Sequence, residues 1–275
     1  MESMDRLSAL VRGLAPRTHV YHAGLLARPG ASAAADGDHL HIHLVTAGDV
    51  CLRWDGAVRT LAGPALVVVR GALAHDIEPG ANVPTLFCVR VDFDGPASPM
   101  LLGGLDAPLV VPFDEAKSDI RRIVGLITAE LAEPRCAHAM LLDHAGEILL
   151  IALLRHLVAI HMLPQGVLAG LGDSGLARVL VALHESPAQT WTLERMAGVA
   201  GMSRTVFAQR FRQVMGTTPK RYLGDFRLML ARREVAAGQG LKRAARVAGY
   251  DSPAALSRAL SRARDRDPAI PAALN

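Results

Sequence analysis

The sequence predicts an α+β fold, in which a β-barrel with a helical hairpin precedes an all-α domain of two helix-turn-helix units joined by a connecting helix. Short β-like runs fill residues 19–112, two apolar helical segments follow them, and one helical motif occurs twice, in residues 199–216 and 247–264. A chain of 275 residues has room for two ordinary domains. We expect a first domain over residues 1–165, a linker over 166–173 and a second domain over 174–275.

Residues 19–112 carry the strand pattern. Runs such as HLHIHLVTAG and PTLFCVRVDFDG alternate between apolar and polar residues. Gly, Pro and Asp separate the runs at spacings of roughly 8–15 residues, which is the rhythm of an all-β sandwich or barrel. The pair Asp55-Gly56, between CLRW and AVRTL, favours a hairpin turn because glycine tolerates a positive φ.

Two helices are expected after the strands. FDEAKSDIRRIVGLITAEL places Ile120, Ile123, Val124 and Ile127 on one stripe, and AHAMLLDHAGEILLIALLRHLVAIH has a wider apolar face. Charged residues and histidines interrupt the second segment too often for a membrane span. A β-barrel followed by such a hairpin is what we expect of a module that senses a ligand and forms a homodimer.

Three histidines, His39, His41 and His43, alternate along one predicted strand and therefore face the same side. His75 stands at the end of a later strand. Imidazoles from neighbouring strands bind Zn, Fe, Ni or Cu, so His41, His43 and His75 are candidate ligand- or metal-binding residues. The alternative is that the histidines pack and form hydrogen bonds inside the barrel. We expect no obligatory cofactor, and a metal ion in the barrel stays an open alternative.

The three cysteines, Cys51, Cys88 and Cys136, are far apart and lack CxxC spacing. They argue against a disulfide scaffold or a thiolate zinc site and fit a reducing cytoplasm. Cys88 is a candidate redox residue, because Arg90 lies two residues away on the same strand face and a sensing thiolate needs positive charge nearby. The alternative is a buried cysteine that acts as a small apolar residue. The N-terminal MESMDRLSALVRGL has early acids and no clean apolar core, so we expect no signal peptide.

The charge differs between the two parts of the chain. Residues 1–175 contain 13 Lys and Arg against 19 Asp and Glu, whereas residues 176–275 contain 17 against 7. An acidic front and a basic back indicate two domains with different partners, and the basic domain is a candidate for binding a polyanion.

The first copy of the helical motif has the signals of a helix-turn-helix. Thr192 caps a short helix, Gly201 turns the chain, and Ser203 caps the next helix, in which Phe207 and Phe211 continue the apolar pattern. Small residues at the turn let the two helices approach closely at a steep angle.

The second copy keeps this pattern. Gly249 stands at its turn, and Leu256 and Leu260 take the core positions of the two phenylalanines. Between the copies, residues 219–238 begin with Pro and end with Gly, which predicts one connecting helix.

Through these motifs the chain resembles a known family. MAGVAGMSRTVFAQRFRQVMGTTPKRYL and AARVAGYDSPAALSRALSR are similar to the paired helix-turn-helix domain of AraC/XylS-type transcriptional regulators, over about Leu176–Pro268. HLVTAGDVCLRWDG and LVVVRGALAH look like the cupin-type sensor domain often fused to it. The resemblance implies a bacterial, cytoplasmic homodimer, associated with the nucleoid when bound, that has double-stranded DNA, RNA polymerase and a small-molecule effector as partners. It implies no enzymatic activity.

The chain departs from this pattern in both domains. Metal-binding cupins have a Glu shortly after the HxH pair and a Pro before the distant His, whereas here both are absent and His75 lies one position late. The second unit has Leu256 and Leu260 where the family usually has aromatics, and its tail keeps Pro268 without the following Tyr and Arg. The second recognition helix also opens with SPAAL, which has few hydrogen-bonding side chains near its N-terminus, so we expect the second unit to contact mostly phosphates and few bases.

Two recognition helices on one connecting helix enter successive major grooves about 34 Å apart, so we expect a long, non-palindromic DNA site. Gln209 and Arg258 are expected to contact bases, Thr205 a thymine methyl, and Arg212 and Arg262 phosphates. The full set of expected DNA contacts is Ser203, Arg204, Thr205, Ala208, Gln209 and Arg212 in the first unit, and Ser252, Ala254, Ala255, Arg258 and Arg262 in the second.

The leading interpretation is a sequence-specific transcription regulator that controls its promoters in response to a small-molecule or redox signal sensed by the barrel. Two alternatives stay open: a metal-dependent cupin enzyme with a DNA-binding tail, and a nonspecific DNA-bridging protein. The missing Glu after His43 opposes the enzyme, and no nucleophile–base pair or phosphate loop elsewhere in the sequence supports catalysis. The ratio of specific to nonspecific affinity distinguishes a regulator from a bridging protein.

Overall fold

The computed structural model describes residues 16–27, 39–93, 105–112, 118–160 and 165–266, together with Leu7, Val11, Ala35 and Gly37. These residues include two compact units, one containing residues 16–93 and 105–160 and the other residues 165–266. Each unit has a buried core of its own. The tail with Pro268 lies outside the described residues.

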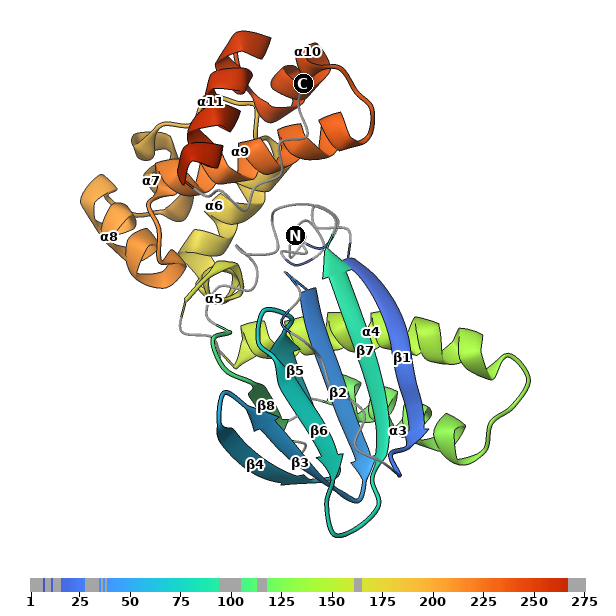
Figure 1. Cartoon of the computed structure of the whole chain (residues 1–275). Helices are drawn as coiled ribbons and strands as arrows, with labels where there is room; N and C mark the ends of the chain where they lie inside the picture. Colours follow the sequence, from blue (N-terminus) through green and yellow to red (C-terminus); the bar gives the residue numbers. More distant parts are fainter. Residues whose placement is uncertain are drawn as a thin grey trace. The chain divides into compact units, whose positions relative to one another are not determined.

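The strand unit contains two antiparallel sheets. Its strands are β1 (Pro16–Leu25), β2 (His39–Ala47), β3 (Asp49–Trp54), β4 (Ala57–Ala62), β5 (Ala65–Arg70), β6 (His75–Pro79), β7 (Thr85–Phe93) and β8 (Leu109–Pro112). The hydrogen-bonded order is β1-β7-β2-β5-β8 in one sheet and β4-β3-β6 in the other (Figure 1). Asp55 and Gly56, both with positive φ, form the predicted hairpin between β3 and β4.

The cupin-like, strand-rich fold is confirmed, but the described strands form two sheets rather than one closed barrel. The chain changes sheet between β2 and β3 at Gly48, whose φ is 74°. An added Cβ at Gly48 would lie 2.5 Å from the carbonyl oxygen of Val83, so this change of sheet requires glycine. Val45 of the larger sheet packs with Leu52 and Ile77 of the smaller one in a single buried core.

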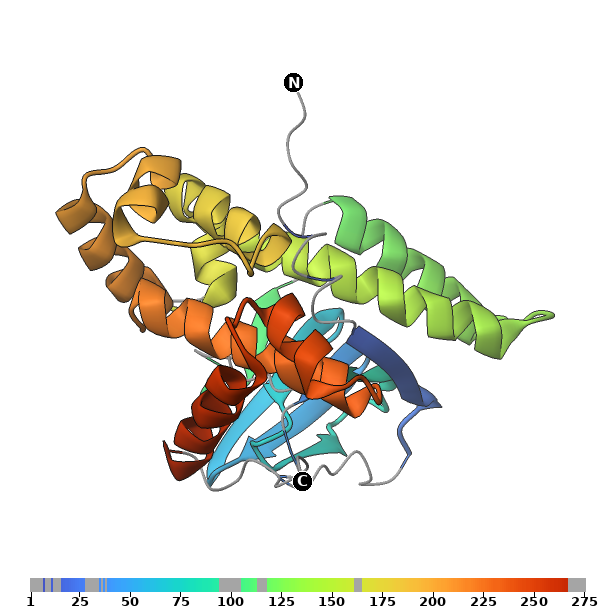
Figure 2. The ribbon, with the colours of Figure 1, turned by 90° about the horizontal axis from the view of Figure 1, so that it is seen from above.

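The predicted helical hairpin consists of α3 (Ser118–Ala132) and α4 (His138–Ala159), which cover one face of the five-stranded sheet (Figure 1 and Figure 2). The helix α4 packs directly on the sheet, since an added Cβ at Gly146 would be in ordinary van der Waals contact with Val89 of β7, at 3.4 Å. Within the parts of the chain that the structure describes, no helix has the length and apolarity needed to cross a membrane.

The segment predicted as a linker, residues 166–173, is instead largely helical and belongs to the second unit. Residues Val167–Gly172 form α5, and most of them are buried. An added Cβ at Gly170 would lie 2.5 Å from the sulfur of Met215, in another helix of this unit. The glycines of this segment indicated a linker between domains. In the structure, Gly170 instead permits close packing of α5 against Met215.

The second unit is all-α among its described residues, as the sequence predicts. After α5 it contains α6 (Ser174–Glu185), α7 (Leu193–Ala200), α8 (Arg204–Met215), α9 (Pro219–Ala236), α10 (Leu241–Ala248) and α11 (Pro253–Arg266). The pairs α7–α8 and α10–α11 are the two helix-turn-helix units, and α9 connects them (Figure 1).

The connecting helix packs through an aromatic cluster centred on Tyr222, which is buried. The hydroxyl oxygen of Tyr222 lies 2.7 Å from Nε2 of His184 in α6. The ring of Phe226 lies 4.4 Å from that of His184, and Phe211 of α8 meets Tyr222 nearly edge-on. Because Tyr222 and Phe226 belong to α9, this cluster holds the first helix-turn-helix to the connecting helix.

Burial in this cluster keeps the imidazole of His184 neutral in the folded chain. It lowers the pKa of His184 from 6.5 to about 4, so protonation favours the unfolded chain. The contribution of neutral His184 to the free energy of unfolding should be complete above about pH 6.5. It should be lost as the pH falls from about 6.5 to about 4, by up to about 3 kcal/mol. Urea unfolding at two pH values across this window should show a smaller loss for His184→Gln than for the wild type. Equal losses would contradict the assignment.

Candidate functional site

Capping residues and a left-handed turn build the first helix-turn-helix. Thr192 and Ser203 cap α7 and α8, each accepting a hydrogen bond from the backbone N–H three residues later, at 3.2 and 3.4 Å. Gly201 ends α7 with φ 71°. Arg178 of α6 donates to the carbonyl oxygen of Ala200 at 2.7 Å, which fastens the end of α7 to α6.

The recognition helix α8 is anchored by Phe207 and Phe211, whose side chains are completely buried. The predicted contacts Thr205, Gln209 and Arg212 lie on the remaining part of the helix surface and are exposed. Within the described residues, the guanidinium of Arg212 forms no ion pair. These three side chains are therefore placed to contact a ligand outside the chain.

Two residues of α8 differ from the expectation. The guanidinium of Arg204 lies 2.9 Å from Glu194 of α7, so this ion pair competes with any contact to DNA, and Ala208 is only partly exposed. Val206 is 53% exposed although it is apolar. Val206 lies on the same helical face as Gln209, three residues later. This spacing could have identified Val206 as a further candidate contact from the sequence.

The second helix-turn-helix repeats the left-handed glycine turn and the serine cap of the second helix, but α10 begins at Gly240 without a side-chain cap. Gly249 ends α10 with φ 74°, and an added Cβ there would lie 2.5 Å from Cα of Ala188, so the position requires glycine. Ser252 accepts a hydrogen bond from the N–H of Ala255 at 3.1 Å, and Leu256 is completely buried. The leucine core that replaces the family's aromatics therefore still closes the unit.

On α11, Arg258 stands two residues after the core residue Leu256, as Gln209 stands two residues after Phe207 in α8. The two side chains therefore occupy equivalent places on the two recognition helices. Ser261 is exposed at the place equivalent to Arg212, and the sequence did not single it out. Of the predicted residues in this unit, Ala254, Arg258 and Arg262 are exposed, and Ser252 and Ala255 are partly buried.

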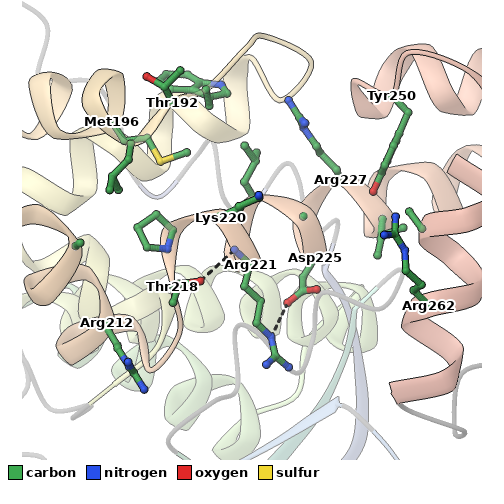
Figure 3. Close-up of a pocket in the computed structure, with 18 of the residues that line it drawn as sticks. Thr192, Met196, Arg212, Thr218, Lys220, Arg221, Asp225, Arg227, Tyr250 and Arg262 are labelled. Atoms are coloured by element: carbon green, nitrogen blue, oxygen red, sulfur yellow. Dashed lines mark hydrogen bonds and ion pairs between the residues drawn. The ribbon is translucent and has the colours of Figure 1, made fainter. Parts of the chain in front are cut away.

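A groove of about 1400 Å³ lies between the recognition helices, with α9 along it. Arg212 of α8 and Arg262 of α11 lie on its two sides, and Lys220 and Arg221 of α9 lie between them (Figure 3). Gln209 also lines the groove. The structure thus brings together four of the predicted contacts, Ala208, Gln209, Arg212 and Arg262. It adds the two exposed cations Lys220 and Arg221, which the sequence did not single out.

The histidine cluster lies in the core of the strand unit. His39, His41 and His43 of β2 and His75 of β6 are each at most 6% exposed. Nε2 of His39 lies 2.9 Å from Nε2 of His41, and Nε2 of His43 lies 2.9 Å from Nε2 of His75. The hydroxyl oxygen of Tyr21, which the sequence did not single out, lies 3.2 Å from Nδ1 of His41 and 3.3 Å from Nδ1 of His43. The cluster is therefore hydrogen-bonded internally.

The same geometry fits a metal ion. Ligand atoms of His41, His43 and His75 lie within 4.8 Å of one another. Nδ1 of His75 donates to the carbonyl oxygen of Leu73 at 3.0 Å, which leaves Nε2 as the ligand atom. Burial holds the pKa of His43 well below its usual value and also lowers the pKa of His75, so both imidazoles are neutral, as metal ligands must be. An all-nitrogen set of this kind suits Zn²⁺ or Cu²⁺ even without the family's Glu.

Cys88 lacks the surroundings of a redox thiolate. It is completely buried, its sulfur lies 3.2 Å from Nδ1 of His43, and burial raises the pKa of its thiol to about 12. Arg90, the cation expected to lower that pKa, is bound to Asp92 at 2.9 Å. This environment favours the alternative of a protonated, buried cysteine over the redox role.

Comparison with known protein families agrees with both parts of this description. A cupin family model matches residues 5–159, which is more than half of the chain, and a helix-turn-helix domain model matches residues 196–269. The chain therefore belongs to the cupin family, in the AraC-type group that joins a cupin domain to a helix-turn-helix domain.

Two relatives come from Streptomyces. The chain is 34% identical over 169 residues to a protein named as an AraC-like transcription regulator of Streptomyces lividans, covering 60% of this chain and 56% of that protein. It is 33% identical over 175 residues to one of Streptomyces antibioticus, covering 62% and 58%. The chain thus spans less than two thirds of the length of these relatives. Among solved structures, ToxT from Vibrio cholerae O395 matches with 10% identity and a TM-score of 0.36, over 90% of this chain and 94% of that one.

Proposed function

We propose that this chain is a sequence-specific regulator of transcription that binds double-stranded DNA in the bacterial cytoplasm. The observation that carries the proposal is the pair of capped helix-turn-helix units whose recognition helices border one cationic groove. The basic charge of residues 176–275 and the family membership support it.

RNA polymerase is the partner that control of a promoter requires. The interaction with RNA polymerase is tested by transcription in vitro from a promoter that carries the DNA motif bound by this protein. A transcription rate that does not respond to the protein would contradict it.

The exposed side chains suggest which groups contact DNA. Gln209 has the amide that pairs with adenine, and Arg258 has the guanidinium that pairs with guanine. Thr205 and Val206 offer methyl groups to thymine, and Val206 is exposed without an internal reason to be apolar. Arg212 lies in the groove beside α9 and is assigned to phosphate. Each recognition helix would then bind its own half-site.

Selection of random duplexes by the purified protein should enrich two unequal half-sites about one helical turn apart. Arg258→Ala should relax the preference at one position of the second half-site, by about 1–3 kcal/mol of discrimination. Arg212→Ala should weaken binding to all duplexes and reduce the salt slope by about one, because it removes one phosphate contact.

The exposed Arg155 of α4 provides the matched control, and Arg155→Ala should change neither property. Identical behaviour of the Arg258 and Arg212 variants would contradict these roles. Binding that enriches no motif and vanishes as salt rises would favour the nonspecific DNA-bridging alternative.

We also propose that His41, His43 and His75 bind a divalent metal ion as a signal or as part of an effector site in the strand unit. The neutral imidazoles, their mutual distances and the orientation of His75 by Leu73 support this role. A bound ion would supply Lewis acidity and would link β2 to β6, which belong to different sheets. The proposal assigns no catalytic activity to the cluster, and the enzyme alternative would need an open coordination position and a substrate.

Calorimetric titration with Zn²⁺ should give about one equivalent bound to the wild type, with a rise in Tm on addition of the ion. His43→Gln and His75→Asn should each abolish this binding, because each removes one of three ligands. His19→Asn changes an exposed histidine on β1 and should bind Zn²⁺ as the wild type does. Unchanged binding in the double variant of His43 and His75 would refute the metal site.

We propose further that the α3–α4 hairpin forms the contact of a homodimer. It leaves four large apolar side chains exposed: Leu126, Met140, Ile148 and Ile151, at 43%, 64%, 50% and 38%. Ile148 and Ile151 are three residues apart and therefore share one face of α4. Apolar side chains gathered on one exposed face are typical of an association surface.

Sedimentation of the wild type should therefore show a dimer, and Ile148→Glu should shift it towards the monomer because a buried, unpaired carboxylate opposes association. Val58→Glu is the matched control, since Val58 on β4 is similarly exposed at 54%. A monomeric wild type, or an Ile148→Glu dimer of unchanged affinity, would exclude this surface.

A further inference from the structure

The connecting helix α9 contains a glycine that the fold itself does not require. Gly224 is the sixth residue of this 18-residue helix, a position where glycine is among the least favourable residues. An added Cβ at Gly224 would meet no heavy atom of the described residues within 4 Å, outside its own stretch of helix. Its φ is also outside the left-handed region. Neither internal packing nor backbone conformation therefore explains the glycine.

Gly224 lines the groove between the two recognition helices. Lys220 and Arg221 precede it by four and three residues, so they lie on the same face of α9, one turn away. Arg212 and Arg262 lie on the two sides of the groove (Figure 3). At Gly224 the helix backbone therefore carries no side chain in a groove whose lining includes Lys220, Arg221, Arg212 and Arg262, together with Asp225.

The charges of the groove favour an anion. Within the described residues, the ammonium of Lys220 forms no hydrogen bond or ion pair, and neither does the guanidinium of Arg212. Arg221 lies 3.7 Å from the carboxylate of Asp225, so these two charges largely offset each other. Arg227 instead donates to backbone carbonyl oxygens of the α6–α7 loop. Lys220 and Arg212 are thus the groove cations left available for an external anion.

The geometry of duplex DNA supplies such an anion at this place. When two recognition helices occupy successive major grooves, the sugar–phosphate backbones that border the intervening minor groove cross the face between them. In this chain that face is the groove along α9. The glycine then has a function, because the absence of a side chain lets another backbone approach a helix closely.

We propose, on the basis of the function proposed above, that the groove seats a sugar–phosphate backbone of the bound duplex directly against α9. Gly224 permits the close approach, and Lys220 and Arg212 bind the phosphates on either side. This contact is independent of base sequence. It holds the central part of the DNA site, between the two half-sites that the recognition helices contact.

The test uses the full chain and a duplex that carries the motif selected by the wild type. Gly224→Ala should weaken binding by about tenfold, both to this duplex and to a scrambled one, and Gly224→Leu should weaken it further. Hydroxyl-radical footprinting should show protection between the half-sites in the wild type and less protection in the variants. The Tm of Gly224→Ala should be unchanged or higher, because alanine favours the helix.

Gly125→Ala is the matched control, because Gly125 lies within α3 and an added Cβ there likewise meets nothing within 4 Å. It should bind DNA as the wild type does. Wild-type affinity and footprint in both Gly224 variants would overturn this proposal while leaving the regulator function intact. Failure of the wild type to select any motif would instead overturn the regulator function, and this proposal with it.

Discussion

The arrangement of the two helix-turn-helix units depends on Arg227 of the connecting helix. Its guanidinium donates to the carbonyl oxygens of Pro187 and Gln189, each at 2.8 Å. Ala188, between them, lies so close to Gly249 that no side chain fits there. The loop that leads into the first unit is therefore held between the connecting helix and the turn of the second unit. Because the major grooves of DNA have a fixed spacing, this loop helps to set whether both recognition helices can bind one duplex.

The strand unit depends on a different kind of contact. His43 and His75 belong to different sheets, and the hydrogen bond between them crosses the core. A group that binds either imidazole must replace this hydrogen bond, so binding at the cluster acts directly on the contact between the sheets. Tyr21 of β1 extends the network to the edge of the larger sheet. The cluster can therefore transmit a local event to three strands of the unit.

Local features of this chain were predictable from sequence and long-range features were not. The caps Thr192 and Ser203 act on backbone groups three residues away, so their roles follow from short segments. The histidine cluster was predictable in part, because strand alternation places three of its members on one side. The role of Gly170 was not, since its neighbour Met215 is distant in sequence. The pKa of Cys88 likewise depends on burial by other strands, which no local pattern contains.

The pairing of β1 with β7 has a consequence for how the chain is made. The paired residues are 60–77 positions apart, from Leu25 with Thr85 to Pro16 with Phe93, and α4, which packs against β1, ends at Ala159. The strand unit therefore cannot complete its native contacts until more than half of the chain has left the ribosome. The helical unit is built largely from neighbouring helices, an arrangement that folds faster than one of distant strand pairings. The strand unit is synthesised first, but its long-range strand pairings delay its folding. Until α4 has been synthesised, unpaired strand edges stay exposed to aggregation.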